Sequence, residues 1–407
     1  MTANTSTNLF KYSIILSFLI VLNYFLWSIN SYQILKFINL FFIFVFLLFF
    51  FLSKDFNYFW YLKIIIFLMI IISLGTPTIP NDSRLIYLFS AKILFYESNL
   101  YTFLENYGLS VNNYFDIVNS RPKFAATLSA SFAQLIGNWN EVYPKSTNII
   151  ILLPPLFCLI SFINKKNFSI LWIFLILFFS GKLFINGLLD SIIGIYFVAC
   201  FFITYKIIFS ELENEKNFYY ASLILFSIIL TLIKNEGFFM IMTIFLSSMM
   251  LCLYYRNKID YMYFFCTLIS FVPILIWKII VIFQNIKFEW IQSGDAFGRI
   301  IERINNVNDL NNIFTFIIHN EKLVISLLFF IVASLLSFKK NRKLIFFTSM
   351  NFLIYFSIII LGLLVSPHDL LVQLEASFVR TFVPLILLLC YSSVLLIKSI
   401  DKKEPLI

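Results

Sequence analysis

Charged residues are scarce in this 407-residue sequence and make up only 13% of it. An ordinary soluble domain is about 25% charged and about 45–50% apolar. Here 61% of the residues are hydrophobic, and the mean hydropathy is +0.91. A water-soluble fold cannot hide so much apolar surface. The composition therefore excludes a cytosolic enzyme, a secreted domain and a disordered regulator, and it indicates that lipid surrounds most of the chain.

Cysteine and histidine are also sparse. All five cysteines lie inside apolar runs, so they form neither a disulfide framework nor a CxxC metal pair. The two histidines, His319 and His368, are far apart in the sequence, which argues against a histidine-rich metal site. The net charge of +9 does not indicate a nucleic-acid partner, because the basic residues form short clusters between apolar runs instead of one patch.

Long apolar runs dominate the rest of the sequence. A membrane-spanning helix needs roughly 20 apolar residues, and about twelve runs meet this criterion. The first run lacks an early cleavage site of small residues, so we interpret it as a retained anchor and not as a signal peptide. The sequence predicts an all-α, polytopic transmembrane protein. The runs are 12–29, 34–53, 59–75, 147–163, 168–184, 187–207, 218–234, 237–255, 262–283, 322–338, 344–366 and 381–398.

The basic residues predict how these spans are oriented. Most of them lie in alternate connections: Lys11, Lys54, Lys165, Lys166, Lys216, Arg256, Lys258, Lys339, Lys340, Arg342, Lys343, Lys402 and Lys403. The positive-inside rule places these connections and both termini in the cytoplasm. The long loops 76–146 and 284–321 and the shorter loop 367–380 are then external.

The external loops contain short segments with helical patterns. One is RLIYLFSAKILFYES at 84–98, and another begins at Pro122, which suits the first turn of a helix. Both are too short and too polar to span, so we expect amphipathic helices on the membrane surface. A further short helix is expected around 296–306, where Arg299 and Arg303 would form a solvated face or contact lipid headgroups.

Ionisable residues beside membrane spans are costly and usually functional. On the predicted external side, five chain segments bring such residues, with polar neighbours, to one level of the membrane. They are Asp82, Asp190, Lys234, Asn235, Glu236, His368, Ser377 and Arg380, and Lys92 lies in the first external loop. A carboxylate at this level can act as general base toward an acceptor hydroxyl. Cations can neutralise a phosphate leaving group. Transfer of a sugar from a lipid-linked sugar phosphate needs both the general base and the cations.

Purely structural interpretations of these residues stay open. Asp82 follows a Pro-Asn pair, which is ordinary turn chemistry, and Asp190 could cap the sixth span. Lys92 and Arg380 could extend toward the headgroups. Lys234 could simply pair with the glutamate two residues later.

Several local sequences resemble those of the GT-C superfamily of integral membrane glycosyltransferases. KNEG within TLIKNEGFF is the sharpest of them, and the others are persuasive in combination. Where relatives have Trp-Asp-Ala, this chain has Asn-Asp-Ser around Asp82. The matching order and spacing cover roughly 78–240 and 365–390. The segments are NDSRLIYLFSAKILFYESNL, RPKFAATLSASFAQLIGNWNE, INGLLDSIIGIYFVA, TLIKNEGFF and SFVRTFVPL.

The resemblance implies a fold and an activity. It implies a catalytic transmembrane core at 59–283 with the external loop 76–146, preceded by N-terminal helices at 1–58 and followed by a C-terminal part at 284–407. The implied reaction moves a sugar from a polyprenyl-phosphate donor to a lipid, glycan or protein acceptor. It would take place at the external, periplasmic face of the cytoplasmic membrane.

The resemblance also implies roles for the polar residues. Asp82 would be the catalytic base or would orient the acceptor. If a divalent metal such as Mg²⁺ or Mn²⁺ takes part, its ligands would be Asp82, Asp190 or Glu236. Lys92, Lys234 and Arg380 would bind the phosphate. Asp190 and Glu236 would hold sugar hydroxyls, a metal ion or the neighbouring cations. The full set of predicted substrate-binding residues is Lys92, Asp190, Lys234, Asn235, Glu236, His368, Ser377 and Arg380.

Other functions stay open for such a chain. A transporter or lipid flippase tends to show two related halves and charges near the bilayer midplane, and this sequence has neither. A polysaccharide polymerase or ligase usually has its largest external loop late in the chain, whereas here the first loop is the largest. A non-catalytic membrane scaffold would tolerate Asp82→Asn.

Overall fold

The computed structural model describes residues 3–29, 33–78, 86–101, 120–209, 213–255, 260–284, 286, 295–366, 369–375 and 379–401. Every regular element among them is helical, which confirms the all-α prediction. The first half of the chain forms α1 (Ala3–Ser28), α2 (Gln33–Leu52), η1 (Lys54–Phe59), α3 (Trp60–Gly75), α4 (Phe89–Glu97), α6 (Phe124–Ile136), α7 (Tyr143–Ile163), α8 (Lys166–Ile185) and α9 (Asp190–Phe209). The second half forms α10 (Glu213–Ile233), α11 (Glu236–Tyr255), α12 (Tyr261–Phe283), α13 (Ala296–Asn305), α14 (Val307–His319), α15 (Glu321–Val365), α16 (Leu370–Gln373), α17 (Val379–Thr381) and α18 (Val383–Asp401).

Ten helices of the described chain are long and apolar enough to cross a membrane. This is the architecture of a multi-pass membrane protein. All twelve predicted runs fall on helices, but they do not give twelve separate long ones. The run 168–184 lies in α8, whose apolar part at 166–181 falls short of that length. The runs 322–338 and 344–366 both lie in the 45-residue α15.

Helix α15 bends at Asn341, whose φ of −124° and ψ of 30° are not helical. The Asn341 amide donates to Ser399 Oγ near the end of α18, at 2.5 Å. At the start of α15, Lys322 Nζ donates to the Phe179 carbonyl of α8 at 3.0 Å, and the carbonyl of Val365 at its other end accepts from α13. The bend at Asn341 therefore lies at one end of the bundle, and both ends of α15 lie at the other. The two halves of α15 consequently run in opposite directions.

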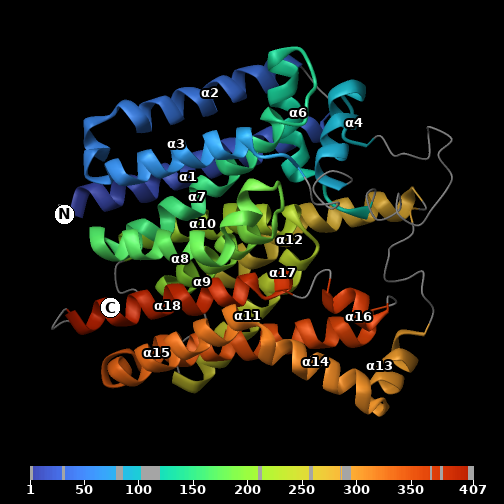
Figure 1. The fold of residues 1–407 in the computed structure, drawn as a ribbon. Helices are drawn as coiled ribbons and strands as arrows, with labels where there is room; N and C mark the ends of the chain where they lie inside the picture. The colour runs from blue at the N-terminus through green and yellow to red at the C-terminus, as the bar shows by residue number, and fades with distance from the viewer. Residues whose placement is uncertain are drawn as a thin grey trace.

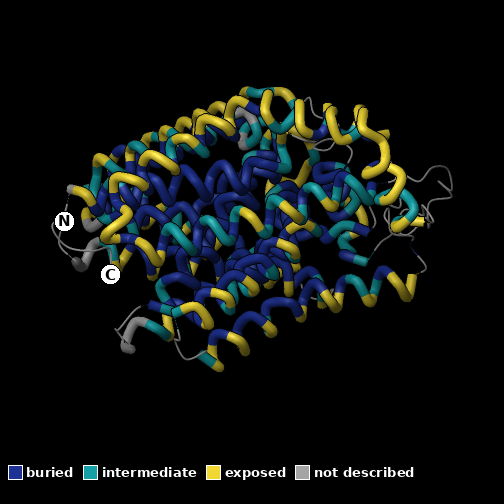
Figure 2. The backbone as a smooth tube through the Cα atoms, turned by 90° about the horizontal axis from the view of Figure 1, so that it is seen from below, coloured by how far each residue is buried: buried dark blue, intermediate teal, exposed yellow. Residues whose placement is uncertain are grey.

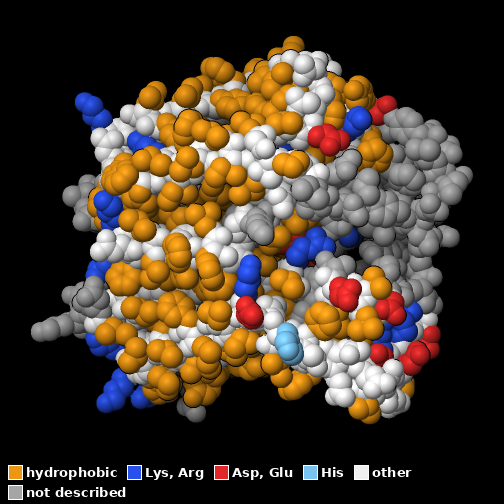
Figure 3. Space-filling model, viewed as in Figure 1, with side chains coloured by type: hydrophobic (Ala, Val, Ile, Leu, Met, Phe, Trp, Pro, Cys, Tyr) orange, Lys and Arg blue, Asp and Glu red, His pale blue; other side chains and the backbone are white. Residues whose placement is uncertain are grey.

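The bundle has two unlike ends. Figure 1 shows both termini at one end and the short helices α4, α6, α13 and α16 at the other. The buried residues line the interior (Figure 2), and hydrophobic side chains cover the middle of the face drawn in Figure 3. Lys and Arg side chains gather at the end that carries the termini (Figure 3). Large exposed apolar residues such as Phe41 and Phe174 suit contact with lipid.

The centre of the bundle is formed by α7, α9 and α18, which are the most buried of the long helices. Two tyrosines link them, because Tyr196 of α9 donates to the Ile151 carbonyl at 2.8 Å and Tyr391 of α18 donates to the Leu159 carbonyl at 2.7 Å. Both carbonyls belong to α7. A buried hydroxyl without a partner costs stability, so these bonds favour one register of the three helices.

Helix α6 differs from the surface helix that was expected, although the helix itself was predicted. Nearly all of its residues are buried between α1, α4 and α7, and only Leu135 and Ile136 at its end are well exposed. Small residues on most sides let neighbouring helices approach closely. The Trp27 indole donates to Ser131 Oγ at 2.8 Å and so holds α6 against α1.

The arginines of α13 also differ from expectation. Arg299 Nε donates to the Val365 carbonyl at 2.9 Å, and a guanidinium nitrogen of the buried Arg303 donates to the Leu363 carbonyl. The last carbonyls of a helix have no partner within it, and they carry partial negative charge. Arg299 and Arg303 therefore satisfy the end of α15, and they do not form a solvated face.

Candidate functional site

Asp190 is the first residue of α9 and lies just after a tight turn from α8. The turn needs Gly187, whose φ of 80° is in the left-handed region. A carboxylate in the first helical turn is stabilised by the positive end of the helix dipole. Asp190 is nevertheless only 5% exposed, so its charge also needs partners that the helix does not supply.

Lys234 is the main partner of Asp190. It lies between α10 and α11, and its Nζ is 2.7 Å from Asp190 Oδ1 with both side chains buried. The same Nζ is 3.9 Å from Glu236 Oε1, and the Glu236 side chain is 49% exposed. Lys234 thus joins one buried and one accessible carboxylate.

Gly237 explains why the sequence KNEG forms this turn. A Cβ on Gly237 would lie 2.0 Å from the carbonyl oxygen of Leu230, which belongs to the last turn of α10. Only glycine lets α11 begin so close to α10. The Gly237 N–H donates to the Lys234 carbonyl at 3.0 Å and closes the turn. The glycine therefore sets where Lys234 and its neighbours lie.

Arg380 on the short helix α17 completes the group. Its Nη1 is 3.9 Å from Asp190 Oδ2, and its side chain is 23% exposed. We call Asp190, Lys234, Glu236 and Arg380 the ion cluster. Three sequence-distant segments meet in it. Figure 3 shows basic side chains in a recess of this face, close to the position of α17 in Figure 1.

Of the other predicted site residues, the structure describes Lys92 and Asn235. Lys92 is exposed on α4, and within the described ranges no ion pair or hydrogen bond links it to the cluster. Asp82, His368 and Ser377 lie outside the described residues. Asn235 lies in the turn itself, beside Lys234.

Tyr87 was missed by the sequence analysis. It precedes α4 and is buried, and it interacts electrostatically with Lys234, Asp190 and Glu236. One tyrosine does not stand out in a chain that is 20% aromatic.

Arg121 and Lys278 were also not predicted to belong to the site. Arg121 interacts electrostatically with Tyr87, and Lys278 of α12 with Glu236 and with Arg121. Lys278 Nζ also donates to the Ser120 carbonyl at 3.5 Å. A lysine inside the predicted span 262–283 is a feature that the rule on intramembrane charges would have found.

Opposing effects set the charge states at this site. Burial alone lowers the pKa of Lys234, but the Asp190 carboxylate, with Tyr87 and Glu236, raises it, and the net direction is upward. Burial raises the pKa of Tyr87. Lys234 is therefore a fixed cation at neutral pH, and Tyr87 keeps its proton and can donate a hydrogen bond.

The described side chains do not fit a divalent metal between Asp190 and Glu236. The Lys234 ammonium occupies the place between the two carboxylates in which such an ion would bind. Across the described ranges, no group of three or more His, Cys, Asp and Glu side chains is placed to hold a metal ion. Asp82, the remaining predicted ligand, lies outside these ranges.

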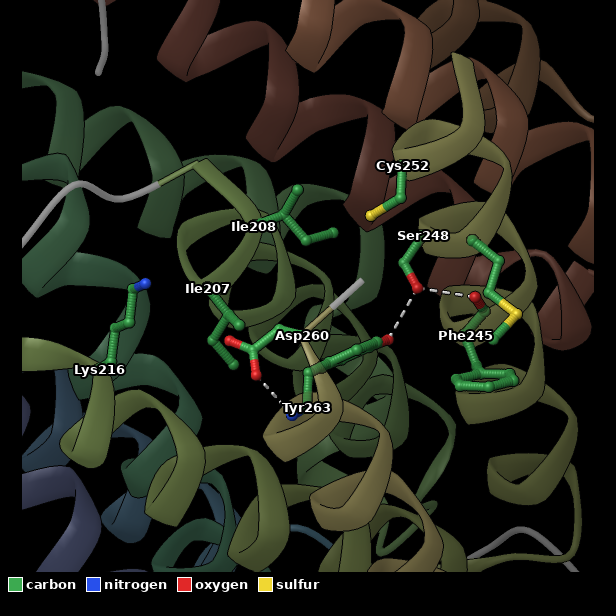
Figure 4. Close-up of a pocket in the computed structure, with 9 residues that line it drawn as sticks. Ile207, Ile208, Lys216, Phe245, Ser248, Cys252, Asp260 and Tyr263 are labelled. Atoms are coloured by element: carbon green, nitrogen blue, oxygen red, sulfur yellow. Dashed lines mark hydrogen bonds between the residues drawn. The ribbon is translucent and has the colours of Figure 1, made fainter. Parts of the chain in front are cut away.

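A separate cavity of about 100 Å³ lies far from the ion cluster, among the ends of α9 and α11 and the starts of α10 and α12. In Figure 4, Asp260 lies directly before α12, and Ser248 of α11 is hydrogen-bonded to Tyr263. The Asp260 carboxylate caps α12 by accepting from two backbone N–H groups and also accepts from the Tyr220 hydroxyl. Because these bonds occupy it, we assign Asp260 a structural role.

Lys123, just before α6, provides a test of burial at this end of the bundle. It is 3% exposed, and its Nζ donates to the Leu100 carbonyl at 3.2 Å. Burial lowers its pKa from the ordinary 10.5 to about 7. Between these values the unfolded chain binds a proton that the folded chain does not, so stability rises with pH there.

We therefore expect Lys123→Met to flatten the rise in unfolding temperature between about pH 7 and pH 10.5. The variant should gain most stability at or below pH 7, where the native lysine is charged and buried. Lys92→Met removes an exposed lysine nearby and should leave the pH profile unchanged. If the unfolding temperature changed with pH in the same way in the wild type and in Lys123→Met, the Lys123 ammonium would be solvated and the prediction would be wrong.

No protein-family model matches this chain, and no curated protein or solved structure matches it either. The resemblance to GT-C glycosyltransferases therefore stays a prediction from the sequence segments that carry it. The geometry adds the ion cluster, which combines accessible and buried charges of both signs beside the ends of several spans.

Proposed function

We propose that this protein is a GT-C-type membrane glycosyltransferase that moves a sugar from a polyprenyl-phosphate donor to a lipid, glycan or protein acceptor. The observation that carries the proposal is the buried pair of Asp190 and Lys234, with Arg380 and Glu236 beside it. These residues come from INGLLD, KNEG and SFVR, three of the segments that carry the resemblance. Buried charge at such a level is expensive and is usually retained for function.

The geometry supports a division of roles within the ion cluster. Lys234 is held by Asp190, so it is better suited to fixing that carboxylate than to binding phosphate alone. Arg380 and Glu236 are partly exposed and can contact a substrate. Arg380 would bind the donor phosphate, because guanidinium groups pair well with phosphate oxygens. Asp82 keeps its proposed role as the base on the acceptor hydroxyl.

The proposed orientation places this chemistry on the external, periplasmic face of the cytoplasmic membrane. The end of the bundle that carries both termini is rich in Lys and Arg (Figure 3), in agreement with the positive-inside rule. The ion cluster belongs to the opposite end, near the short helices. On this proposal, α8 and the two halves of α15 count as separate passes, giving the predicted twelve.

A transporter or flippase is the main alternative. Transporters tend to place their charged sites near the bilayer midplane, at broken helices. Here the cluster is formed at helix ends, by the first residue of α9 and by the turn between α10 and α11. This placement favours an enzyme that acts at the membrane surface.

Transfer from the donor tests the proposal. Purified protein in lipid should remove the sugar from at least one of a panel of polyprenyl-phosphate sugars. Asp82→Asn should reduce turnover by about 10²-fold or more, since a general base typically contributes that much. Glu302→Gln, which changes an exposed acid on α13, is the matched control. Equal turnover by wild type and Asp82→Asn would remove Asp82 from the mechanism.

A further inference from the structure

Three buried polar atoms near the ion cluster have no hydrogen-bond partner among the described residues. They are Asp190 Oδ2, Asn235 Oδ1 and the Tyr87 hydroxyl. Folded proteins rarely leave such atoms unpaired, because each costs about 1–3 kcal/mol. Asp190 binds Lys234, Asn235 follows Lys234 in the chain, and Tyr87 interacts electrostatically with both members of the ion pair. All three residues are therefore linked to Lys234: Asp190 by the ion pair, Tyr87 electrostatically and Asn235 as its neighbour in the chain.

The chemistry of these atoms indicates what would satisfy them. The carboxylate oxygen and the amide oxygen are acceptors only, whereas the tyrosine hydroxyl both donates and accepts. A phosphate group offers oxygens that need donors, so it does not suit two acceptors. The hydroxyl groups of a sugar are donors and acceptors together, and they suit all three atoms.

Resting on the proposed function, we propose that Tyr87, Asn235 and Oδ2 of Asp190 form the subsite for the sugar of the lipid-linked donor. Lys234 and Arg380 hold the Asp190 carboxylate in place from its two sides. The donor phosphate then lies toward the partly exposed Arg380. Tyr87 is a substrate-binding residue on this account, and its position just before α4 couples the first external segment to the ion cluster.

Tyr87→Phe is a sharp test because it removes only the hydroxyl. We expect binding of a polyprenyl-phosphate sugar to weaken about 3- to 10-fold, the effect of one hydrogen bond. Binding of the bare polyprenyl phosphate should not change. The unfolding temperature should stay the same or rise, because an unpaired buried hydroxyl is lost. Asn235→Ala should show the same selective loss independently.

Tyr61→Phe is the matched control, because it removes another buried hydroxyl, in the first turns of α3 near Ser169 of α8. It should bind both lipids as the wild type does. If Tyr87→Phe weakens both lipids equally, the hydroxyl contacts the phosphate and the sugar subsite is wrong. If it weakens neither while the wild type transfers sugar, the subsite is wrong and the proposed function stands.

The same binding measurement distinguishes failure of the proposed sugar subsite from failure of the proposed function. If the wild type transfers no sugar but binds the sugar-linked lipid through Tyr87, the proposed function fails and the subsite is supported. If the wild type binds neither lipid, the subsite and the proposed function are both overturned.

Discussion

Asp190→Asn is expected to destabilise the protein by about 3–5 kcal/mol, because among the described residues it leaves the buried Lys234 cation with Glu236, at 3.9 Å, as its remaining carboxylate partner. Lys234→Met should cost less, since Asp190 keeps Arg380 at 3.9 Å. The double variant combines Asp190→Asn with Lys234→Met and leaves no unpaired buried charge at these two positions. Most of the stability lost in Asp190→Asn should therefore return. The measurement is the unfolding temperature of each variant in the same lipid or detergent.

The double variant separates stability from function. If the ion cluster binds and orients the substrate, the double variant should still transfer sugar about 10²-fold or more slowly than the wild type, although its stability is restored. Asp260→Asn is a suitable control, because Asp260 is also a carboxylate at a helix N-terminus, where it caps α12, but it lies far from the ion cluster. Transfer at the wild-type rate by the double variant would make the pair purely structural.

Gly237→Ala is expected to be the most damaging change of a single methyl group. The new Cβ would lie 2.0 Å from the Leu230 carbonyl oxygen, and that backbone atom cannot move without displacing the last turn of α10. We expect a loss of about 3 kcal/mol or more in the free energy of unfolding. Lys234 and Glu236 would be displaced with the turn, so sugar transfer should fall as well.

Gly362→Ala is the matched control for this prediction. Gly362 lies within α15, and a Cβ there would meet nothing within 4 Å. Replacing a helical glycine by alanine at an open position should leave stability unchanged or raise it by about 0.4–1 kcal/mol. Equal effects of the two substitutions would contradict the close approach of α11 to α10.

The helices could be predicted from the sequence because lipid allows so few alternatives. Backbone groups in a membrane must be paired within the segment, so long apolar runs form helices. Helix ends and neighbours were harder to predict. The charges around Asn341 predicted a connecting loop, and the structure makes this connection as a kink at Asn341 between the two halves of α15. The segment of α6 is too short and too polar to span, which predicted a surface helix, but its small residues favour close packing against neighbouring helices.

The sequence grouped the charged residues of the candidate site but did not show how they pair. Charge patterning predicted Asp190, Lys234 and Arg380 on one side of the membrane, and the structure brings their side chains together. Which charges pair depends on α9 and α10 packing side by side, and no local pattern encodes that contact. Tyr87 could not be found in the sequence, because its role depends on where the first external segment meets the bundle.

The most direct test of the central claim follows the donor in sealed vesicles that contain the purified protein. A polyprenyl-phosphate sugar is labelled in both its sugar and its lipid, and the assay measures breakage of the bond between them and movement of the intact lipid between leaflets. We predict that the bond breaks, leaving the sugar on an acceptor and free polyprenyl phosphate in the membrane. Movement of the intact lipid with no bond breakage would contradict the enzyme and support a flippase.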